Sequence, residues 1–117
     1  MSEYNVVTLC GSMRFYQWML KVAEKETLDG NIVIMPFVQK DNYLSDEARE
    51  NLSVFLDKMH KAKIDMADEI VICTDNAGYI GDSTLDEIQY SAKNLKPIRF
   101  AFDPSTPEKG ADPDDYK

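Results

Sequence analysis

The sequence predicts a three-layer α/β fold in which a parallel sheet of about four strands, in the order 2-1-3-4, has helices on both faces. Short apolar runs alternate with longer segments in which apolar residues recur every three or four positions, as in amphipathic helices. This alternation is typical of a parallel sheet with right-handed crossovers. With 117 residues, 44% of them hydrophobic, the chain is large enough for one core and too small for two domains.

Each element follows from its own pattern, and together they give a flavodoxin- or Rossmann-like arrangement. The predicted strands are the apolar runs at residues 5–10, 32–35, 69–73 and 97–102. The predicted helices cover about residues 12–28, 45–66 and 84–95. Asp29-Gly30 ends the first helix, and Ser45 caps the second after a polar loop at 39–45. The apolar face of the third helix consists of Leu85, Ile88, Ala92 and Leu95.

We expect these elements to form a single α/β domain at residues 1–103. Residues 104–117 follow as a polar C-terminal tail, in which prolines, a glycine and charged residues leave no apolar surface for a core.

The charge balance limits the class of partner. Thirteen basic and 21 acidic residues give a formal net charge of −8, which argues against a nucleic-acid polymer or an anionic membrane. A small anion bound by backbone amides is compatible with this charge. Cys10 and Cys73 each end an apolar strand, as small buried hydrophobic residues do, and no signal peptide, spanning segment or lipidation motif is visible. We therefore expect a reduced, cytoplasmic protein.

The segment between the third strand and the third helix is the richest in chemistry. It reads Gly78-Tyr79-Ile80-Gly81-Asp82-Ser83-Thr84-Leu85-Asp86-Glu87. Two interpretations are open: an active-site loop, or a capping box in which Thr84 and Glu87 satisfy each other's backbone donors. The strand order 2-1-3-4 places the loops after Cys10 and Cys73 side by side, where such sheets bind ligands.

The loop after the first strand has the composition of an anion site. Gly11 lets the backbone approach a ligand, Ser12 offers a hydroxyl at a helix amino end, and Arg14 adds a guanidinium one turn later. The alternatives are that Ser12 is a plain helix cap and that Arg14 pairs with a surface carboxylate.

Taken together, three segments resemble the nucleoside 2-deoxyribosyltransferase superfamily, including its nucleotide N-glycosidase members. They are Cys-Gly-Ser-Met-Arg at 10–14, Ala-Asp-Glu-Ile-Val-Ile at 67–72, and the helix start at 78–92, and the likeness covers most of residues 5–101. The resemblance implies that Glu87 is the nucleophile that attacks the anomeric carbon of the sugar. It also implies that Gly11, Ser12 and Arg14 hold a substrate phosphate, and that the protein forms a homodimer or a larger homo-oligomer.

The chain departs from this family in two ways. Members usually carry an aspartate eight residues before the Ala-Asp pair of the third strand, where this chain has His60. The family also has a fifth strand and helix that are missing here. His60, Asp82 and Asp86 are the candidates that could protonate or hydrogen-bond the departing base, although a lone histidine on a helix is also a common packing residue.

Tyr79, Gly81, Ser83 and Thr84 complete the predicted site, and Tyr90 is a candidate for positioning Glu87. Gly81, Ser83 and Thr84 lie in the glycine loop and at the helix start, where they would bind substrate. Tyr79 would stack on a base, or pack against the protein. Tyr90 would orient Glu87, or pack likewise. Asp82, Asp86 and Glu87 are too close in sequence to form a dedicated metal site, so we predict no metal and no cofactor.

Two hypotheses follow. The first is an enzyme that cleaves the N-glycosidic bond of a nucleoside or nucleoside monophosphate, or transfers its 2-deoxyribosyl group, through a glutamate nucleophile. The second is a non-catalytic nucleotide-binding or sensing module of the same fold. A phosphoryl-transfer P-loop is excluded because the sequence has no Gly-x-x-x-x-Gly-Lys-Ser/Thr motif.

Overall fold

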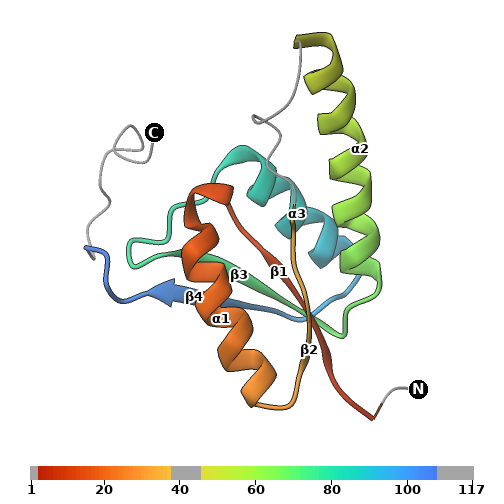
Figure 1. The fold of residues 1–117 in the computed structure, drawn as a ribbon. Coiled ribbons are helices and arrows are strands. Elements are labelled where there is room, and N and C mark those ends of the chain that lie inside the picture. Colours follow the sequence, from red (N-terminus) through yellow and green to blue (C-terminus); the bar gives the residue numbers. More distant parts are fainter. Residues whose placement is uncertain (1–2, 38–45, 108–117) are drawn as a thin grey trace.

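The structure, a computed structural model, describes residues 3–37 and 46–107 and confirms the predicted fold class (Figure 1). One parallel four-stranded sheet has the order β2-β1-β3-β4. Its strands are β1 (Val6–Cys10), β2 (Ile32–Ile34), β3 (Glu69–Asp75) and β4 (Ile98–Asp103). The helices are α1 (Tyr16–Leu28), α2 (Asp46–Asp65) and α3 (Asp82–Lys93), and a short 3-10 helix, η1 (Met13–Phe15), precedes α1.

Several boundaries differ from those predicted. β3 continues two residues past Cys73, because Thr74 and Asp75 still pair with β4, so the second loop starts after Asp75. The first helix begins at Tyr16, since the residues from Met13 to Phe15 form the tighter 3-10 turn. Ser45, the 39–45 loop and the tail beyond residue 107 lie outside the described residues.

The sheet has a hydrophobic core on each face, which is why its strands are almost continuously apolar. On the α1 face, the buried core residues are Val7, Leu9, Met19, Val22, Met35, Val71 and Cys73. On the α2 and α3 face, they are Cys10, Ile64, Ala67, Ile70 and Ile72. Figure 1 shows α1 on the near face of the sheet and α3 on the far face. Helices therefore cover both faces, as predicted.

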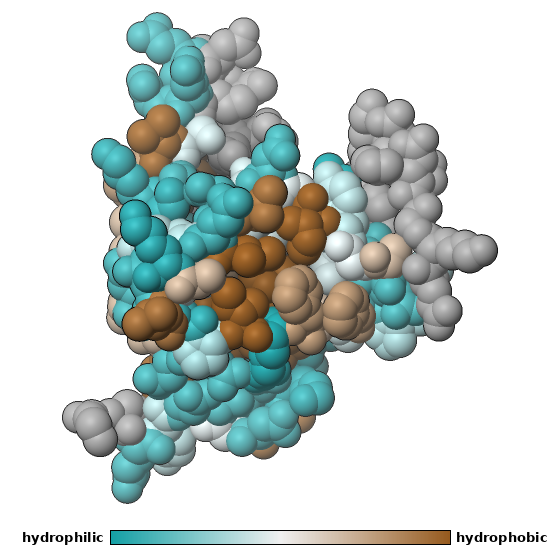
Figure 2. All heavy atoms as spheres, turned by 180° about the vertical axis from the view of Figure 1, so that it is seen from behind, coloured by the Kyte–Doolittle hydropathy of each residue, from teal (hydrophilic) through white to brown (hydrophobic). Residues whose placement is uncertain are grey.

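Side chains of β4 alternate between the two faces. Ala101 packs against the α1-face core, and its carbonyl accepts a hydrogen bond from Trp18 Nε1 at 2.9 Å. Phe100 and Phe102 consequently point to the opposite face, where their rings stack at 5.7 Å and remain 43% and 48% exposed. Figure 2 shows this face, with apolar side chains gathered near its centre.

The prediction for Leu95 was wrong. This residue lies beyond the end of α3 with φ of +60° and is 89% exposed, so it does not extend the apolar face of the helix. No helix in the described part of the chain is long and apolar enough to cross a membrane.

Candidate functional site

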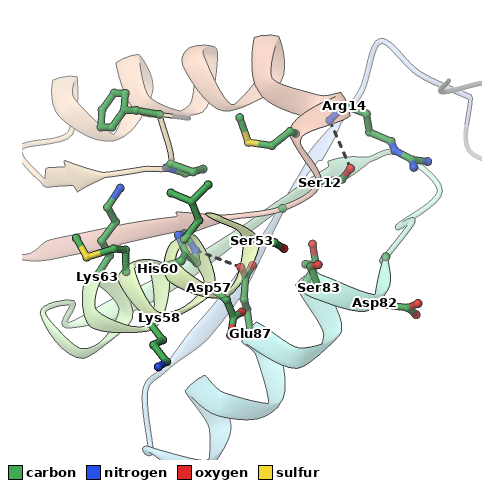
Figure 3. Close-up of a pocket in the computed structure, with 18 of the residues that line it drawn as sticks. Ser12, Arg14, Ser53, Asp57, Lys58, His60, Lys63, Asp82, Ser83 and Glu87 are labelled. Atoms are coloured by element: carbon green, nitrogen blue, oxygen red, sulfur yellow. Dashed lines mark hydrogen bonds and ion pairs between the residues drawn. The ribbon is translucent and has the colours of Figure 1, made fainter. Parts of the chain in front are cut away.

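An open pocket of about 690 Å³ lies where the loops after β1 and β3 meet, with α2 as its other wall (Figure 3). All ten predicted site residues line it: Gly11, Ser12, Arg14, His60, Tyr79, Gly81, Asp82, Ser83, Thr84 and Glu87. The predicted convergence of the two loops is confirmed. In a 2-1-3-4 sheet this is the switch point at which crossovers leave in opposite directions and open a crevice.

Sequence reasoning missed most of the α2 wall. This helix contributes Ser53, Val54, Leu56, Asp57, Lys58, Met59 and Lys63 in addition to His60. The missed signal is their spacing: Ser53, Leu56, His60 and Lys63 recur at three- and four-residue intervals and therefore share one side of the helix.

Glu87 and His60 face each other across the pocket floor from α3 and α2 (Figure 3). Glu87 Oε2 lies 3.6 Å from His60 Nε2, and the two side chains are 13% and 10% exposed. Contacts between the two helices lie on the turns beside this pair. Lys61 Nζ lies 3.0 Å from Asp86 Oδ2, and the Tyr90 hydroxyl donates to Asp65 Oδ1 at 2.7 Å.

The contact made by Tyr90 answers a question that the sequence left open. Its hydroxyl is hydrogen-bonded to Asp65 of α2, so Tyr90 fixes the helix pair instead of orienting the Glu87 carboxylate.

Cys10 is the third member of the cluster, although the sequence pattern indicated only a small core residue there. It is fully buried at the end of β1, and its Sγ lies 3.1 Å from the same nitrogen, His60 Nε2. Burial, followed by the negative charge of Glu87, raises the pKa of the Cys10 thiol well above its ordinary value. Cys10 is therefore a neutral thiol at neutral pH.

Burial also sets the charge state of His60. Desolvation is the main cause and the charge of Lys63 the second, and together they lower the pKa of His60 to about 4, with Asp57 opposing the shift. The ring is neutral at pH 7, so it can share a hydrogen bond but is a weak proton donor.

The capping-box interpretation of Thr84 and Glu87 is wrong. The α3 helix begins at Asp82 with Gly81 as its N-cap, and no side chain caps it. Thr84 is therefore the third residue of the helix and 3% exposed. Glu87 lies in the second turn, where the helix macrodipole has less influence than at the first residues. Asp82 occupies the first turn instead, is exposed and projects away from Glu87 (Figure 3).

Ser12 and Arg14 occupy the pocket rim above the end of β1 (Figure 3). Ser12 caps η1, since its Oγ accepts a bond from the Arg14 backbone nitrogen at 3.4 Å. The guanidinium of Arg14 lies 4.6 Å from the centre of the Tyr79 ring, a cation–π contact. Tyr79 also meets Phe15 edge-on at 6.1 Å. The arginine and the tyrosine thus form one side of the rim together.

Gly11 has a structural role in the sheet in addition to its place in the pocket lining. A Cβ atom at Gly11 would lie 2.4 Å from the carbonyl oxygen of Cys73 and 2.9 Å from Met19 Cε. Its φ of +151° is also one that other residues rarely adopt. Glycine is required here because the chain leaves β1 in close contact with β3.

One group of residues in the described part of the chain could hold a metal ion: Cys10, His60 and Glu87, whose ligand atoms all lie within 4.8 Å of one another. The sequence argument against a metal considered only the acidic residues of one segment. This group draws on β1, α2 and α3 instead.

Searches of protein-family models, curated proteins and solved structures gave no match for this chain. The basis for a functional assignment is therefore the geometry of the pocket, together with the sequence resemblance described above.

Proposed function

We propose that this protein cleaves the N-glycosidic bond of a nucleoside or nucleoside monophosphate, or transfers the 2-deoxyribosyl group, with Glu87 as the nucleophile. The observation that carries the proposal is the position of the Glu87 carboxylate, largely buried on the floor of a pocket at the β1/β3 switch point. The resemblance to nucleoside 2-deoxyribosyltransferases independently points to the same residue.

The chemistry suits a carboxylate in this position. As the bond to the base breaks, positive charge develops on the sugar ring, and a nearby carboxylate stabilises it. Glu87 Oε2 attacks the anomeric carbon, and the base leaves with the bonding electrons and takes up a proton. Water or a second base then attacks the same carbon and releases Glu87.

The pocket suits a ligand of this size. Its volume of about 690 Å³ is within the range of small-molecule sites. The rim offers an aromatic ring at Tyr79, a guanidinium at Arg14 and hydroxyls at Ser12 and Ser83. An aromatic face suits a base, and a guanidinium beside a hydroxyl suits a phosphate.

His60 serves in this proposal as a positioning residue. It is neutral at pH 7 and contacts Glu87 directly, so it holds the carboxylate and is a poor acid for the departing base. Asp82 projects away from Glu87, and Asp86 pairs with Lys61 outside the pocket lining, which leaves the solvent as the source of the proton for the base.

Base release measured by chromatography, over a panel of nucleosides and their monophosphates, tests the proposal. We expect the wild type to release base and Glu87→Gln to lose at least about a thousandfold in rate, because the nucleophilic charge is gone. Glu24→Gln on the exposed surface of α1 is the matched control and should retain the wild-type rate.

Two results would contradict the proposal. Release by Glu87→Gln at the wild-type rate would show that Glu87 is not the nucleophile. Nucleotide binding by the wild type without release of any base would favour the alternative, a non-catalytic nucleotide-binding or sensing module.

We also infer that the chain assembles into a homodimer or larger homo-oligomer. Large apolar side chains of α1 and α2 are exposed, among them Leu20 at 42%, Leu28 at 80%, Phe55 at 57% and Met59 at 42%. Association would remove this surface from water. Light scattering at micromolar concentration tests the inference, and a mass of 13.4 kDa would overturn it.

A further inference from the structure

We propose that Cys10, His60 and Glu87 form a binding site for a single zinc ion on the floor of the pocket. The three side chains come from β1, α2 and α3, and they supply a thiol sulfur, an imidazole nitrogen and a carboxylate oxygen within 4.8 Å of one another. Sulfur, nitrogen and carboxylate oxygen are the ligands that zinc takes in proteins.

The distances match those around a tetrahedral ion. With zinc bonds of about 2.3 Å to sulfur and about 2.1 Å to nitrogen or oxygen, neighbouring ligand atoms stand about 3.4–3.6 Å apart. The observed separations are 3.1 Å from Cys10 Sγ to His60 Nε2 and 3.6 Å from His60 Nε2 to Glu87 Oε2. The third separation, from Cys10 Sγ to the Glu87 carboxylate, is at most 4.8 Å, so side-chain shifts of about 0.5–1 Å would seat the ion.

The arrangement around His60 also favours an ion over hydrogen bonds alone. Cys10 Sγ and Glu87 Oε2 approach the same nitrogen, Nε2. A ring nitrogen carries one hydrogen or one lone pair, so it makes one well-directed hydrogen bond at a time. This also separates the cluster from a nucleophile–histidine–acid triad, in which the acid contacts the other ring nitrogen.

The ligand set selects the class of cation. Thiolate and imidazole favour zinc over calcium and magnesium, which prefer oxygen ligands. Thiolate and carboxylate carry two negative charges, which the ion balances when it displaces the Cys10 proton to solvent. His60 and Glu87 both line the pocket, so the fourth position of a tetrahedral ion would be open to it.

Zinc would also compete with the proposed catalysis, a consequence that rests on the proposed function although the site itself does not. A Glu87 oxygen that coordinates the ion has its electron pair engaged and cannot attack the sugar. Zinc is then expected to inhibit base release.

Metal titration of the full-length, reduced, metal-free protein tests the site. Cobalt(II) is added first, since a cobalt–thiolate bond gives a charge-transfer absorption band, and zinc affinity is then measured against a chromophoric chelator. We expect one equivalent of either ion, the thiolate band with cobalt, and release of about one proton per ion. Absence of a bound equivalent in the wild type would overturn the proposal.

Variants locate the ion. Cys10→Ser should abolish the cobalt–thiolate band and weaken zinc binding at least about 100-fold, because loss of an outer-sphere partner alone costs up to that much. Cys73→Ser is the matched control, since Cys73 is also buried, at 1% exposure, but belongs to the α1-face core. Equal loss in both variants would refute the site.

His60→Asn covers the case in which Cys10→Ser fails to fold. It keeps the thiol and should still weaken zinc binding at least about 100-fold, whereas unchanged affinity would overturn the proposal. None of these measurements uses turnover. Zinc binding through Cys10 without release of base would therefore support the zinc site and contradict the proposed function. Release of base without zinc binding would support the proposed function and contradict the zinc site.

Discussion

Glu26 and Glu87 are both largely buried carboxylates on helices that cover the sheet, but they lie on opposite faces and have different partners. Glu26 of α1 is 2% exposed, accepts hydrogen bonds from the Arg99 guanidinium, and receives another from Asn31 Nδ2 at 3.0 Å. Glu87 of α3 faces His60, whose ring is neutral at pH 7. Glu26 therefore contacts a permanent cation, whereas the ring that Glu87 faces is uncharged.

Access differs as well. Glu87 lines the large pocket, whereas Glu26 does not. Arg99 also bonds Glu69 of β3, so the Glu26 network ties α1 to two strands. Burial of a carboxylate is therefore no sign of function by itself. What distinguishes the two sites is the guanidinium that contacts Glu26 on one face, and the neutral imidazole that contacts Glu87 at the pocket on the other.

The largest effect on stability should come from breaking the Glu26 network. Arg99→Met removes the guanidinium from the buried Glu26 and leaves it with Lys25, which is 4.0 Å away and 73% exposed, so we expect a loss of about 3–5 kcal/mol of unfolding free energy in urea denaturation. Lys21→Met, at an exposed position of α1, is the control and should cost well under about 1 kcal/mol. Adding Glu26→Met to Arg99→Met should recover most of the loss. A small loss in Arg99→Met would mean that Glu26 tolerates burial alone.

The second prediction concerns the neutral ring beside Glu87. The pKa of His60 falls from 6.5 in the unfolded chain to about 4 in the fold. The neutral ring therefore contributes fully to the free energy of unfolding above pH 6.5, and this contribution is lost as the pH falls toward 4. The loss is roughly 3 kcal/mol. The groups that face the ring or bear on its charge are Cys10, Glu87, Asp57 and Lys63.

Urea denaturation of the wild type and His60→Asn at several pH values between 7 and 4 measures this contribution. The carboxylates common to both proteins cancel in the difference, so the wild type should lose more stability than the variant. Parallel pH profiles would show that His60 is not held neutral by the fold.

A third prediction concerns Gly11, which directly follows Cys10 and lies against both Cys73 and Met19. Gly11→Ala should cost about 2–3 kcal/mol, because the new methyl group overlaps the backbone of β3. Gly30→Ala separates the cost of backbone strain from the cost of steric overlap. Gly30 also has a positive φ, +94°, but a methyl group there would meet no atom within 4 Å. It should cost about 1 kcal/mol. Equal melting temperatures for the two variants would contradict the close contact with β3.

The smallest expected change in stability tests the comparison between Glu26 and Glu87 most directly. Glu87→Gln should change the unfolding free energy by less than about 1 kcal/mol, since the amide keeps the shape and gives up a desolvated charge. Glu26→Gln should cost about 2 kcal/mol, because it weakens charge-assisted bonds to Arg99. Thermal unfolding of both variants tests the contrast, and a larger loss in Glu87→Gln would reverse the roles assigned to the two residues.

Sequence patterns were sufficient for the architecture and for the location of the pocket. The strand order and the convergence of the two loops followed from alternating apolar runs and from the handedness of crossovers. The same patterns failed where contacts depend on packing. They did not predict that α3 starts at Asp82, that Tyr90 bonds Asp65, or that Leu95 lies outside the helix.

By itself, the sequence determined the order and approximate positions of the strands and helices and which loops share an edge of the sheet, because periodicity, chain direction and crossover handedness are local or topological properties. Only the tertiary structure decided that Cys10, His60 and Glu87 meet within 4.8 Å, and that Glu26 meets Arg99 across the other face. Such contacts join residues tens of positions apart. They depend on the rotation and height at which each helix packs on the sheet, which the packing of many side chains sets together.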